Sequence, residues 1–262
     1  MMLEIKDAVC GYGEKTVLKG ISVKVQAGDI LCILGPNGVG KTTLFKTILG
    51  FLKLKGGEIT MNGENIHNYS RKRLARTIAY VPQAHVPSFP YTVMDVVVMG
   101  RTAHMGIFSS PTREDIRIAE EALENLNIFF LKNQIYTEIS GGERQMVLLA
   151  RAIAQQTEIL VMDEPASNLD FGNQVKVLEQ INSLAEKGMG IIMTSHFPDH
   201  AFLCSTKVAL LQKNNIFITG SAERVITEKN LKAAYGVDVK IIRGREVRGK
   251  TVRSCVPRMR QI

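Results

Sequence analysis

The residues most clearly able to do chemistry form a glycine-rich loop, residues 35–42, with the sequence Gly-Pro-Asn-Gly-Val-Gly-Lys-Thr. The loop matches G-x-x-x-x-G-K-[ST] at every fixed position and lies between a predicted strand and a predicted helix. Glycines let backbone N–H groups turn inward, where these groups and the positive end of the following helix can surround a polyphosphate. Lys41 can place its charge on the β- and γ-phosphates, and the Thr42 hydroxyl can ligate Mg²⁺. The loop therefore predicts a nucleotide site.

A second candidate group, Asp163-Glu164, follows the apolar run 159–162. That run predicts a buried strand, and doubly wound sheets bind ligands at the carboxyl ends of their strands. Asp163 can hold the water shell of a metal ion, and Glu164 can act as a general base on an attacking water. Together with Lys41 and Thr42, these carboxylates predict a P-loop nucleotidase. The chain has no Asn-Lys-x-Asp guanine reader, which disfavours a G protein, but a small-molecule kinase stays open on these motifs alone.

The elements that must position these residues alternate between strand and helix patterns. Strands are expected at residues 3–9, 21–25, 29–34, 58–62, 77–81, 159–162 and 190–194. Helices are expected at residues 41–49, ending at Gly50, and at 113–126, 143–154 and 172–187. Residues 207–211 and 216–219, joined across Asn214-Asn215, predict a hairpin. The alternation predicts an α/β core with a parallel, helix-covered sheet, interrupted by a helical insert at about 84–155.

The segment 140–145, Ser-Gly-Gly-Glu-Arg-Gln, narrows the class. Ser140 and Glu143 form an S-x-x-E capping box that starts a helix running through Ala154, and a glycine-containing helix start is also an anion site. Because it precedes the Asp163-Glu164 strand by about one helix, the segment resembles the signature motif of ABC transporter ATPases. This resemblance covers roughly residues 3–240. It departs from the commonest motif only mildly, at Ile139 and Glu143.

The resemblance implies an ABC ATPase fold: a P-loop core, an N-terminal antiparallel β subdomain and an inserted helical subdomain. The ATPase domain would span residues 1–240, followed by a basic tail at 241–262. Tyr12 is similar to the aromatic residue that stacks on adenine, Gln83 to the glutamine that touches Mg²⁺ and the attacking water, and His196 to the switch histidine at the γ-phosphate. The implied catalytic residues are Glu164, His196 and Gln83, and the implied Mg²⁺ ligands are Thr42, Gln83 and Asp163. The implied nucleotide-binding residues are Tyr12, Gly35, Pro36, Asn37, Gly38, Val39, Gly40, Lys41, Thr42, Thr43 and Asp163.

The same resemblance implies that two copies of the chain work together as a homodimer. Phosphates on the Lys41 loop of one copy would be capped by the signature segment of the other, and a D-loop would cross between them. The implied signature residues acting in trans are Ser140, Gly141, Gly142 and Glu143. The implied D-loop residues are Ser167, Asn168, Leu169 and Asp170.

Residues 91–101 resemble the importer subfamily that serves iron-siderophores, haem and cobalamin, with molybdate-type importers as near relatives. We therefore expect an ATP- and Mg²⁺-dependent ATPase on the cytoplasmic face of the membrane. Its expected partners are two polytopic permease subunits, whose coupling helix would enter a groove near residues 83–101, and a periplasmic or extracellular binding protein. The alternative is a soluble ABC ATPase in a cytosolic assembly or repair complex. The cargo itself is not predicted, because this subunit would not touch it.

Composition limits the remaining classes. The net charge is +8, yet residues 243–262 alone carry seven basic side chains and one acidic one, so the rest of the chain is not strongly basic and no nucleic-acid partner is expected. We expect that tail to be solvated and poorly ordered, with contact to anionic lipid or an acidic partner as the alternative. No apolar run approaches the ~18–20 residues of a membrane span, and no signal peptide is evident. Four scattered cysteines favour a reducing compartment.

Overall fold

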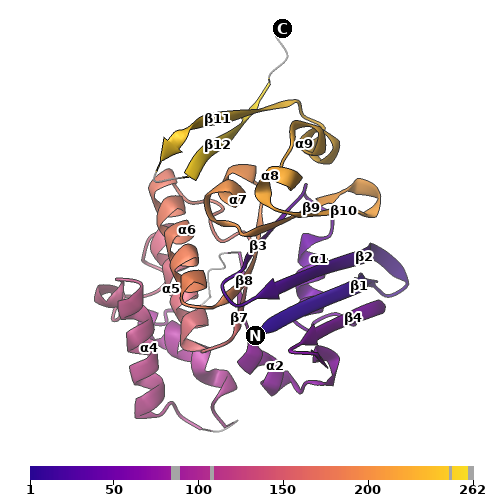
Figure 1. Cartoon of the computed structure of the whole chain (residues 1–262). Helices are drawn as coiled ribbons and strands as arrows, with labels where there is room; N and C mark the ends of the chain where they lie inside the picture. The colour runs from indigo at the N-terminus through magenta and orange to yellow at the C-terminus, as the bar shows by residue number, and fades with distance from the viewer. Residues whose placement is uncertain (84–88, 107–108, 248–249, 259–262) are drawn as a thin grey trace.

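The computed structural model describes residues 1–83, 89–106, 109–247 and 250–258, which form three sheets with helices packed around them (Figure 1). The strands are β1 (Met2–Tyr12), β2 (Lys15–Gln26), β3 (Ile30–Leu34), β4 (Gly56–Met61), β5 (Glu64–Asn65), β6 (Ile78–Val81), β7 (Ile159–Met162), β8 (Gly190–Ser195), β9 (Lys207–Gln212), β10 (Ile216–Gly220), β11 (Val239–Val247) and β12 (Lys250–Pro257). The helices are α1 (Lys41–Ile48), α2 (Arg71–Thr77), α3 (Val93–Val98), α4 (Arg113–Asn125), α5 (Gly141–Ala154), α6 (Phe171–Glu186), α7 (Pro198–Cys204), α8 (Ala222–Val225) and α9 (Glu228–Tyr235). Short 3₁₀ helices are η1 (Ile66–Asn68), η2 (Met99–Ala103), η3 (Phe129–Leu131) and η4 (Lys213–Asn215).

The central sheet has the strand order β10-β9-β3-β8-β7-β6. Its strands pair in parallel from β9 to β6, and β10 closes one edge as the antiparallel partner of β9. A separate antiparallel sheet has the order β2-β1-β4-β5. The predicted parallel sheet, the predicted β9–β10 hairpin and the expected antiparallel β subdomain are therefore confirmed.

Two hydrophobic cores cover the two faces of the central sheet. Along β3, Ile30, Cys32 and Leu34 pack into a core shared with α3 to α9, which we call the helix-side core. The alternate residues Leu31 and Ile33 pack into a second core, shared with α1 and the antiparallel sheet. Successive strand side chains point to opposite faces, so a strand covered on both faces reads as a continuous apolar run. This double burial fixes the carboxyl ends of the parallel strands, from which the polar loops project.

The helices between β6 and β7 pack at one end of the molecule, where α4 lies far from β11 and β12 (Figure 1). A buried ion pair holds this group together: Arg101 Nε lies 3.0 Å from Asp115 Oδ1, and Arg101 Nη1 donates to the Ala154 carbonyl at 2.8 Å. Hydrogen bonds from Thr112, together with the guanidinium, lower the pKa of Asp115 to about 2. The predicted start of the insert, residues 84–88, lies outside the described residues.

The expectation of a poorly ordered basic tail is wrong for residues 243–247 and 250–257. Strands β11 and β12 form an antiparallel hairpin in which Ile241 pairs with Cys255, and both side chains pack against the helix-side core. The backbone N–H of Cys255 donates to Asp199 Oδ1 at 2.8 Å, and Arg253 pairs with Glu223. Packing of Ile241 and Cys255, together with these polar contacts, therefore attaches the hairpin to the rest of the fold.

Candidate functional site

The glycine-rich loop connects β3 to α1, and its conformation explains the glycines. Gly38 has φ 76° and Gly40 has φ 114°, a left-handed region that favours glycine. A Cβ at Gly40 would also lie 2.8 Å from Leu18 Cγ, whereas Gly38 faces open space. The loop thus leaves the backbone of its central residues accessible, directly before the positive end of α1.

Lys41 begins α1, and its side chain lies back under the loop. The ammonium group donates to the Gly35 carbonyl at 2.7 Å and to the Pro36 carbonyl at 3.2 Å. The residue is only 6% exposed, and this burial lowers the pKa of Lys41, while the negative charges of Glu164 and Asp163 oppose that shift. A partly desolvated cation with flexible carbonyl partners is well suited to exchange them for phosphate oxygens.

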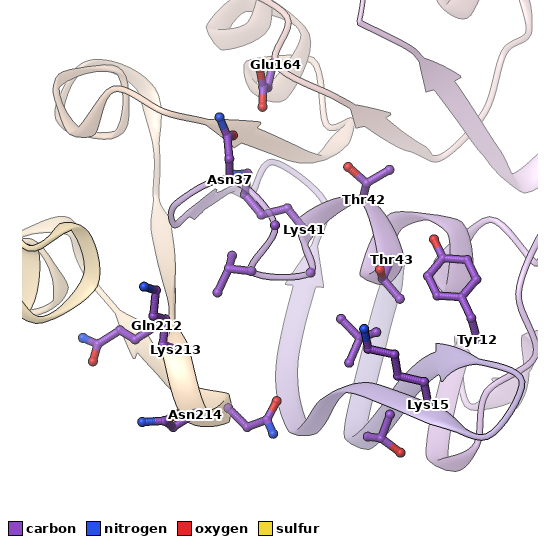
Figure 2. Close-up of a pocket in the computed structure, with 16 residues that line it drawn as sticks. Tyr12, Lys15, Asn37, Lys41, Thr42, Thr43, Glu164, Gln212, Lys213 and Asn214 are labelled. Atoms are coloured by element: carbon purple, nitrogen blue, oxygen red, sulfur yellow. The ribbon is translucent and has the colours of Figure 1, made fainter.

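The loop forms the floor of an open cavity of about 680 Å³ (Figure 2). Its lining combines the glycine-rich loop with residues from the β1–β2 turn, the β9–β10 turn and the end of β7. Tyr12, at the end of β1, is 43% exposed and presents its ring at one side of the cavity, with Lys46 Nζ 5.8 Å from the ring centroid. The glycine-rich loop and Tyr12 therefore line the same cavity.

Some lining residues were missed by the sequence analysis. They are Lys15, Thr16, Val17, Gln212, Lys213, Asn214 and Asn215. Asn214 and Asn215 both have positive φ, 63° and 59°, which asparagine tolerates better than most residues. The turn that contains them was predicted, but its place beside the glycine-rich loop was not, because it depends on the parallel pairing of β9 with β3. Figure 2 shows this turn on the side of the cavity away from Tyr12.

Asp163 lies at the carboxyl end of β7, opposite the start of α1. Its Oδ2 atom is 3.5 Å from Thr42 Oγ1, and its Oδ1 atom accepts a 2.7 Å hydrogen bond from the Thr194 hydroxyl. The hard oxygens of Thr42 and Asp163 are of the kind that Mg²⁺ prefers, so this pair fits the expected ion. In the described part of the chain, no group of three or more His, Cys, Asp or Glu side chains is arranged to hold a metal.

Glu164 is at the centre of a polar cluster. Its carboxylate pairs with His196 Nε2 and, through its other oxygen, accepts from Gln83 Nε2 at 3.3 Å. The same amide nitrogen lies 3.3 Å from Ser167 Oγ, and that hydroxyl donates to the Glu164 carbonyl at 2.9 Å. Glu164 has φ 51°, unusual for a residue with a side chain and a form of strain that clusters at functional sites. Two of the predicted catalytic side chains, His196 and Gln83, thus both contact the third, Glu164.

The signature segment begins α5 with a full capping box. Ser140 Oγ accepts from the Glu143 N–H at 3.3 Å, and Glu143 Oε2 accepts from the Ser140 N–H at 2.8 Å, as predicted. Hydrogen bonds from Ser140 lower the pKa of Glu143. None of the described residues lining the nucleotide cavity comes from this segment.

The D-loop residues lead from Glu164 to α6. Ser167 contacts Gln83, Asn168 has φ 59°, Leu169 packs against the helix-side core, and Asp170 caps α6. Asp170 accepts hydrogen bonds from both the backbone and the side-chain amide of Asn173, each at 2.8 Å. A Cβ at Gly142 would lie 2.6 Å from Asn173 Cγ. The D-loop and the signature segment of one chain are therefore packed together through Asn173.

Comparisons with known proteins agree with this geometry. The family model described as "ABC transporter" matches residues 18–167. An ABC transporter ATP-binding protein of Haemophilus influenzae is 42% identical over 235 residues, covering 90% of this chain and 89% of that protein. A protein of Helicobacter pylori assigned to iron-chelatin transport is 36% identical over 244 residues, covering 92% and 96%. A solved chain from a metal-chelate type ABC transporter in an inward-facing conformation has a TM-score of 0.87 at 31% identity, covering 98% of this chain and 97% of its own.

Across the residues that the structure describes, no helix is both long and apolar enough to span a bilayer. The family match covers more than half of the chain, and the H. influenzae relative covers nearly all of it. The chain therefore belongs to the ABC transporter family as an ATP-binding subunit, a class that hydrolyses ATP to drive transport.

Proposed function

We propose that the chain binds ATP with Mg²⁺ and uses its hydrolysis to power the import of an iron-siderophore, haem, cobalamin or a related metal chelate or oxyanion. The adenine would stack on Tyr12, and the glycine-rich loop with Lys41 would bind the phosphates. Thr42, Gln83 and Asp163 would hold Mg²⁺, which when bound neutralises charge on the β- and γ-phosphate oxygens. The assignment is supported by the shared cavity that Tyr12, the glycine-rich loop with Lys41, and Thr42 line, and by the 3.5 Å distance from Thr42 Oγ1 to Asp163 Oδ2.

Glu164 would act as the general base, with its carboxylate orienting and deprotonating the attacking water. Its contacts to His196 and Gln83 support this role, because they hold the carboxylate toward the loop that binds the γ-phosphate. His196 would then bind the γ-phosphate, and Gln83 would also touch the attacking water. In both cases the side chain would exchange its contact with Glu164 for one with substrate.

The observation that carries the proposal is that the cavity is open and the signature segment lies on another part of the same chain. A second copy would close the cavity by bringing the residues Ser140, Gly141, Gly142 and Glu143 onto the bound phosphates. The exposed start of α5, with space around Gly141, suits an anion approaching from outside. The D-loop residues 167–170 would cross the interface. The working unit would be a homodimer with two ATP molecules between its copies.

ATP-binding subunits of ABC importers work with membrane permease components. We propose two permease subunits and an external binding protein as partners, and a position on the cytoplasmic face of the membrane. The similarity to the H. pylori iron-chelatin protein and to the metal-chelate type transporter supports this substrate class.

A groove of about 530 Å³ supports a docking place for the permease. It lies between the end of α1, α2, η2 and α5, and includes Met99 and Gly100 from the stretch expected to receive a coupling helix. Phe51 at its rim is 71% exposed, and Arg71 and Arg151 also line it. An apolar rim with nearby cations fits an amphipathic helix that carries an acidic residue.

The decisive experiment is to mix Glu164→Gln with ATP and Mg²⁺ and to measure molar mass by light scattering. We expect an ATP-dependent dimer, whereas the added change Ser140→Arg should prevent dimerisation and leave ATP binding to the monomer intact. Full ATPase activity from a strictly monomeric preparation would refute the proposal. Reconstitution with the permease and a panel of ferric chelates, haem, cobalamin and molybdate would then identify the cargo. Phe51→Asp should abolish co-purification with the permease.

A further inference from the structure

A buried threonine on β8, Thr194, lies between the two carboxylates of the site. Its side chain is fully buried, at 0% exposure, and it precedes His196 by two residues. Its Oγ1 atom is 2.7 Å from Asp163 Oδ1 and 2.9 Å from the backbone nitrogen of Glu164. A single hydroxyl thus contacts both residues that follow β7.

The direction of these two hydrogen bonds follows from which of the three groups carry a hydrogen. The Glu164 backbone nitrogen can only donate, so the Thr194 oxygen accepts there. A hydroxyl has one hydrogen, which is then free to be donated to the Asp163 carboxylate. The hydroxyl thus acts once as an acceptor and once as a donor, and neither contact could be made by an apolar side chain of the same shape.

For Asp163, the hydroxyl fixes which oxygen faces the nucleotide loop. Oδ1 is engaged by Thr194, and Oδ2 lies 3.5 Å from Thr42 Oγ1, on the side where the ion is expected. Without the hydroxyl, the Asp163 carboxylate could rotate, so that either of its oxygens could face Thr42. The Thr194 contact therefore holds one oxygen of Asp163 in the direction of Thr42.

For Glu164, the hydroxyl replaces a missing backbone partner. The β7–β8 ladder ends with the pair Met162–Met193, and the Asp163 N–H is still satisfied by the Val81 carbonyl at 2.9 Å. At the next residue, Glu164, the backbone has φ 51°, and the Glu164 N–H donates to the Thr194 side chain. This bond stabilises the strained backbone from which the Glu164 carboxylate reaches His196.

We infer that Thr194 is a positioning residue for ATP hydrolysis, which orients Asp163 toward the ion and holds Glu164 in the conformation of the general base. The inference rests on the proposed roles of Asp163 and Glu164. It concerns a residue that is buried from solvent and is not itself among the residues lining the cavity, although it contacts one of them, Glu164. A substitution of Thr194 would therefore change the turnover and the metal affinity, and would change the affinity for ATP much less.

The test compares Thr194→Val, which keeps the shape and removes the hydroxyl, with Thr194→Ser, which keeps the hydroxyl. Thr157→Val is the matched control, since Thr157 is also buried and donates to the Ile159 carbonyl at 3.0 Å, but at the opposite end of β7. Each variant of the whole chain is assayed for kcat and KM for ATP. Mn²⁺ binding is measured by electron paramagnetic resonance with a non-hydrolysable ATP analogue.

We expect Thr194→Val to lower kcat and Mn²⁺ affinity by about 10–100-fold, the range typical of partners that orient metal ligands. Its KM for ATP should change by less than about threefold, and Thr194→Ser should recover most of the lost turnover. Thr157→Val should match the wild type in both assays. If Thr194→Val does not yield folded protein, Thr194→Ala set against Thr194→Ser gives the same contrast.

The inference is overturned if Thr194→Val keeps wild-type kcat and Mn²⁺ affinity, or if Thr194→Ser is as impaired as Thr194→Val. Glu164→Gln, assayed in parallel, separates this failure from a failure of the proposed function. If Glu164→Gln turns over at the wild-type rate, the assigned base is wrong. If Glu164→Gln is inactive while Thr194→Val is unaffected, only the role of Thr194 is refuted.

Discussion

The side-chain amide of Gln83 lies 3.3 Å from Glu164 Oε2, although 81 positions separate the two residues in the chain. Gln83 comes just after β6, where the chain leaves the central sheet for the inserted helices, and Glu164 follows β7. The same amide contacts Ser167, which begins the D-loop. Contacts of 3.3 Å are long for hydrogen bonds, so they can be exchanged at little cost when substrate arrives.

Lys41→Ala should abolish ATP binding. The substitution removes the ammonium group that lies beneath the glycine-rich loop, and the carbonyls of Gly35 and Pro36 would then face the phosphates without its charge. We expect affinity to fall by more than about 100-fold, or about 2.7 kcal/mol. Isothermal titration with ATP measures it. Lys19→Ala, an exposed lysine on β2, is the control, and near-normal binding by Lys41→Ala would contradict the assignment.

Tyr12→Ala should weaken ATP binding without changing the chemical step. Stacking of a base on an aromatic ring contributes about 1–3 kcal/mol by alanine substitution. The ring is exposed at the cavity wall and makes no described hydrogen bond, so Tyr12→Phe should bind ATP as well as the wild type. Equilibrium binding would measure the affinity for ATP, and single-turnover rates would measure the chemical step. Equal losses in both variants would show that the hydroxyl matters more than the ring.

Residues held by local backbone geometry were predictable. The glycine-rich loop, the start of α1 at Lys41 and its end before Gly50 all follow from glycine conformations that a short segment encodes. The capping box of Ser140 and Glu143 is likewise local. The parallel sheet was predictable because strands covered on both faces must be apolar throughout.

Residues that act through distant partners were not predictable. Asn173 lies in a helix and Thr194 in a strand, and neither residue type is unusual there. The contact of Asn173 with Gly142, and that of Thr194 with Asp163, form only after the elements pack. The β11–β12 hairpin was missed because the basic side chains of residues 243–262 favoured the prediction of a solvated tail. Its inward-facing pair, Ile241 and Cys255, is recognisable only once the register of the two strands is known.

Gly142→Ala should destabilise the contact between the signature segment and the D-loop. The new Cβ would lie 2.6 Å from the Asn173 side chain, which Asp170 holds at 2.8 Å and which therefore cannot move freely. Overpacking of this kind costs about 1–3 kcal/mol in the free energy of unfolding. Denaturant titration measures it.

The double variant Gly142→Ala with Asn173→Ala provides the control for that prediction, because it removes the atoms with which the new Cβ collides. It should be more stable than expected from the sum of the two single changes. Strict additivity would show that α5 and α6 do not meet at this point.

His200 should make the stability of the chain depend on pH near neutrality. The ring is buried, its Nδ1 lies 3.1 Å from Ser195 Oγ, and burial lowers its pKa below 6.5 while the charge of Asp199 opposes the shift. Above that value the imidazole is neutral in both states. As the pH falls through 6.5, the unfolded chain takes up the proton first, so the unfolding free energy decreases until the folded-state pKa is reached.

Urea titrations between about pH 7.5 and pH 5.5 test this sign, since they bracket the titration of an unfolded histidine. The wild type should lose stability toward the acid end, and His200→Gln should lose less. His67→Gln, which replaces an exposed histidine, should retain the wild-type slope. His200 contacts Ser195, whose hydroxyl accepts from the Phe197 N–H, and the His200 and Phe197 ring centroids are 5.2 Å apart. A flatter pH profile for His200→Gln would therefore also localise the acid sensitivity to residues 195–200. Identical slopes for the wild type and His200→Gln would mean that other groups govern the pH dependence of stability.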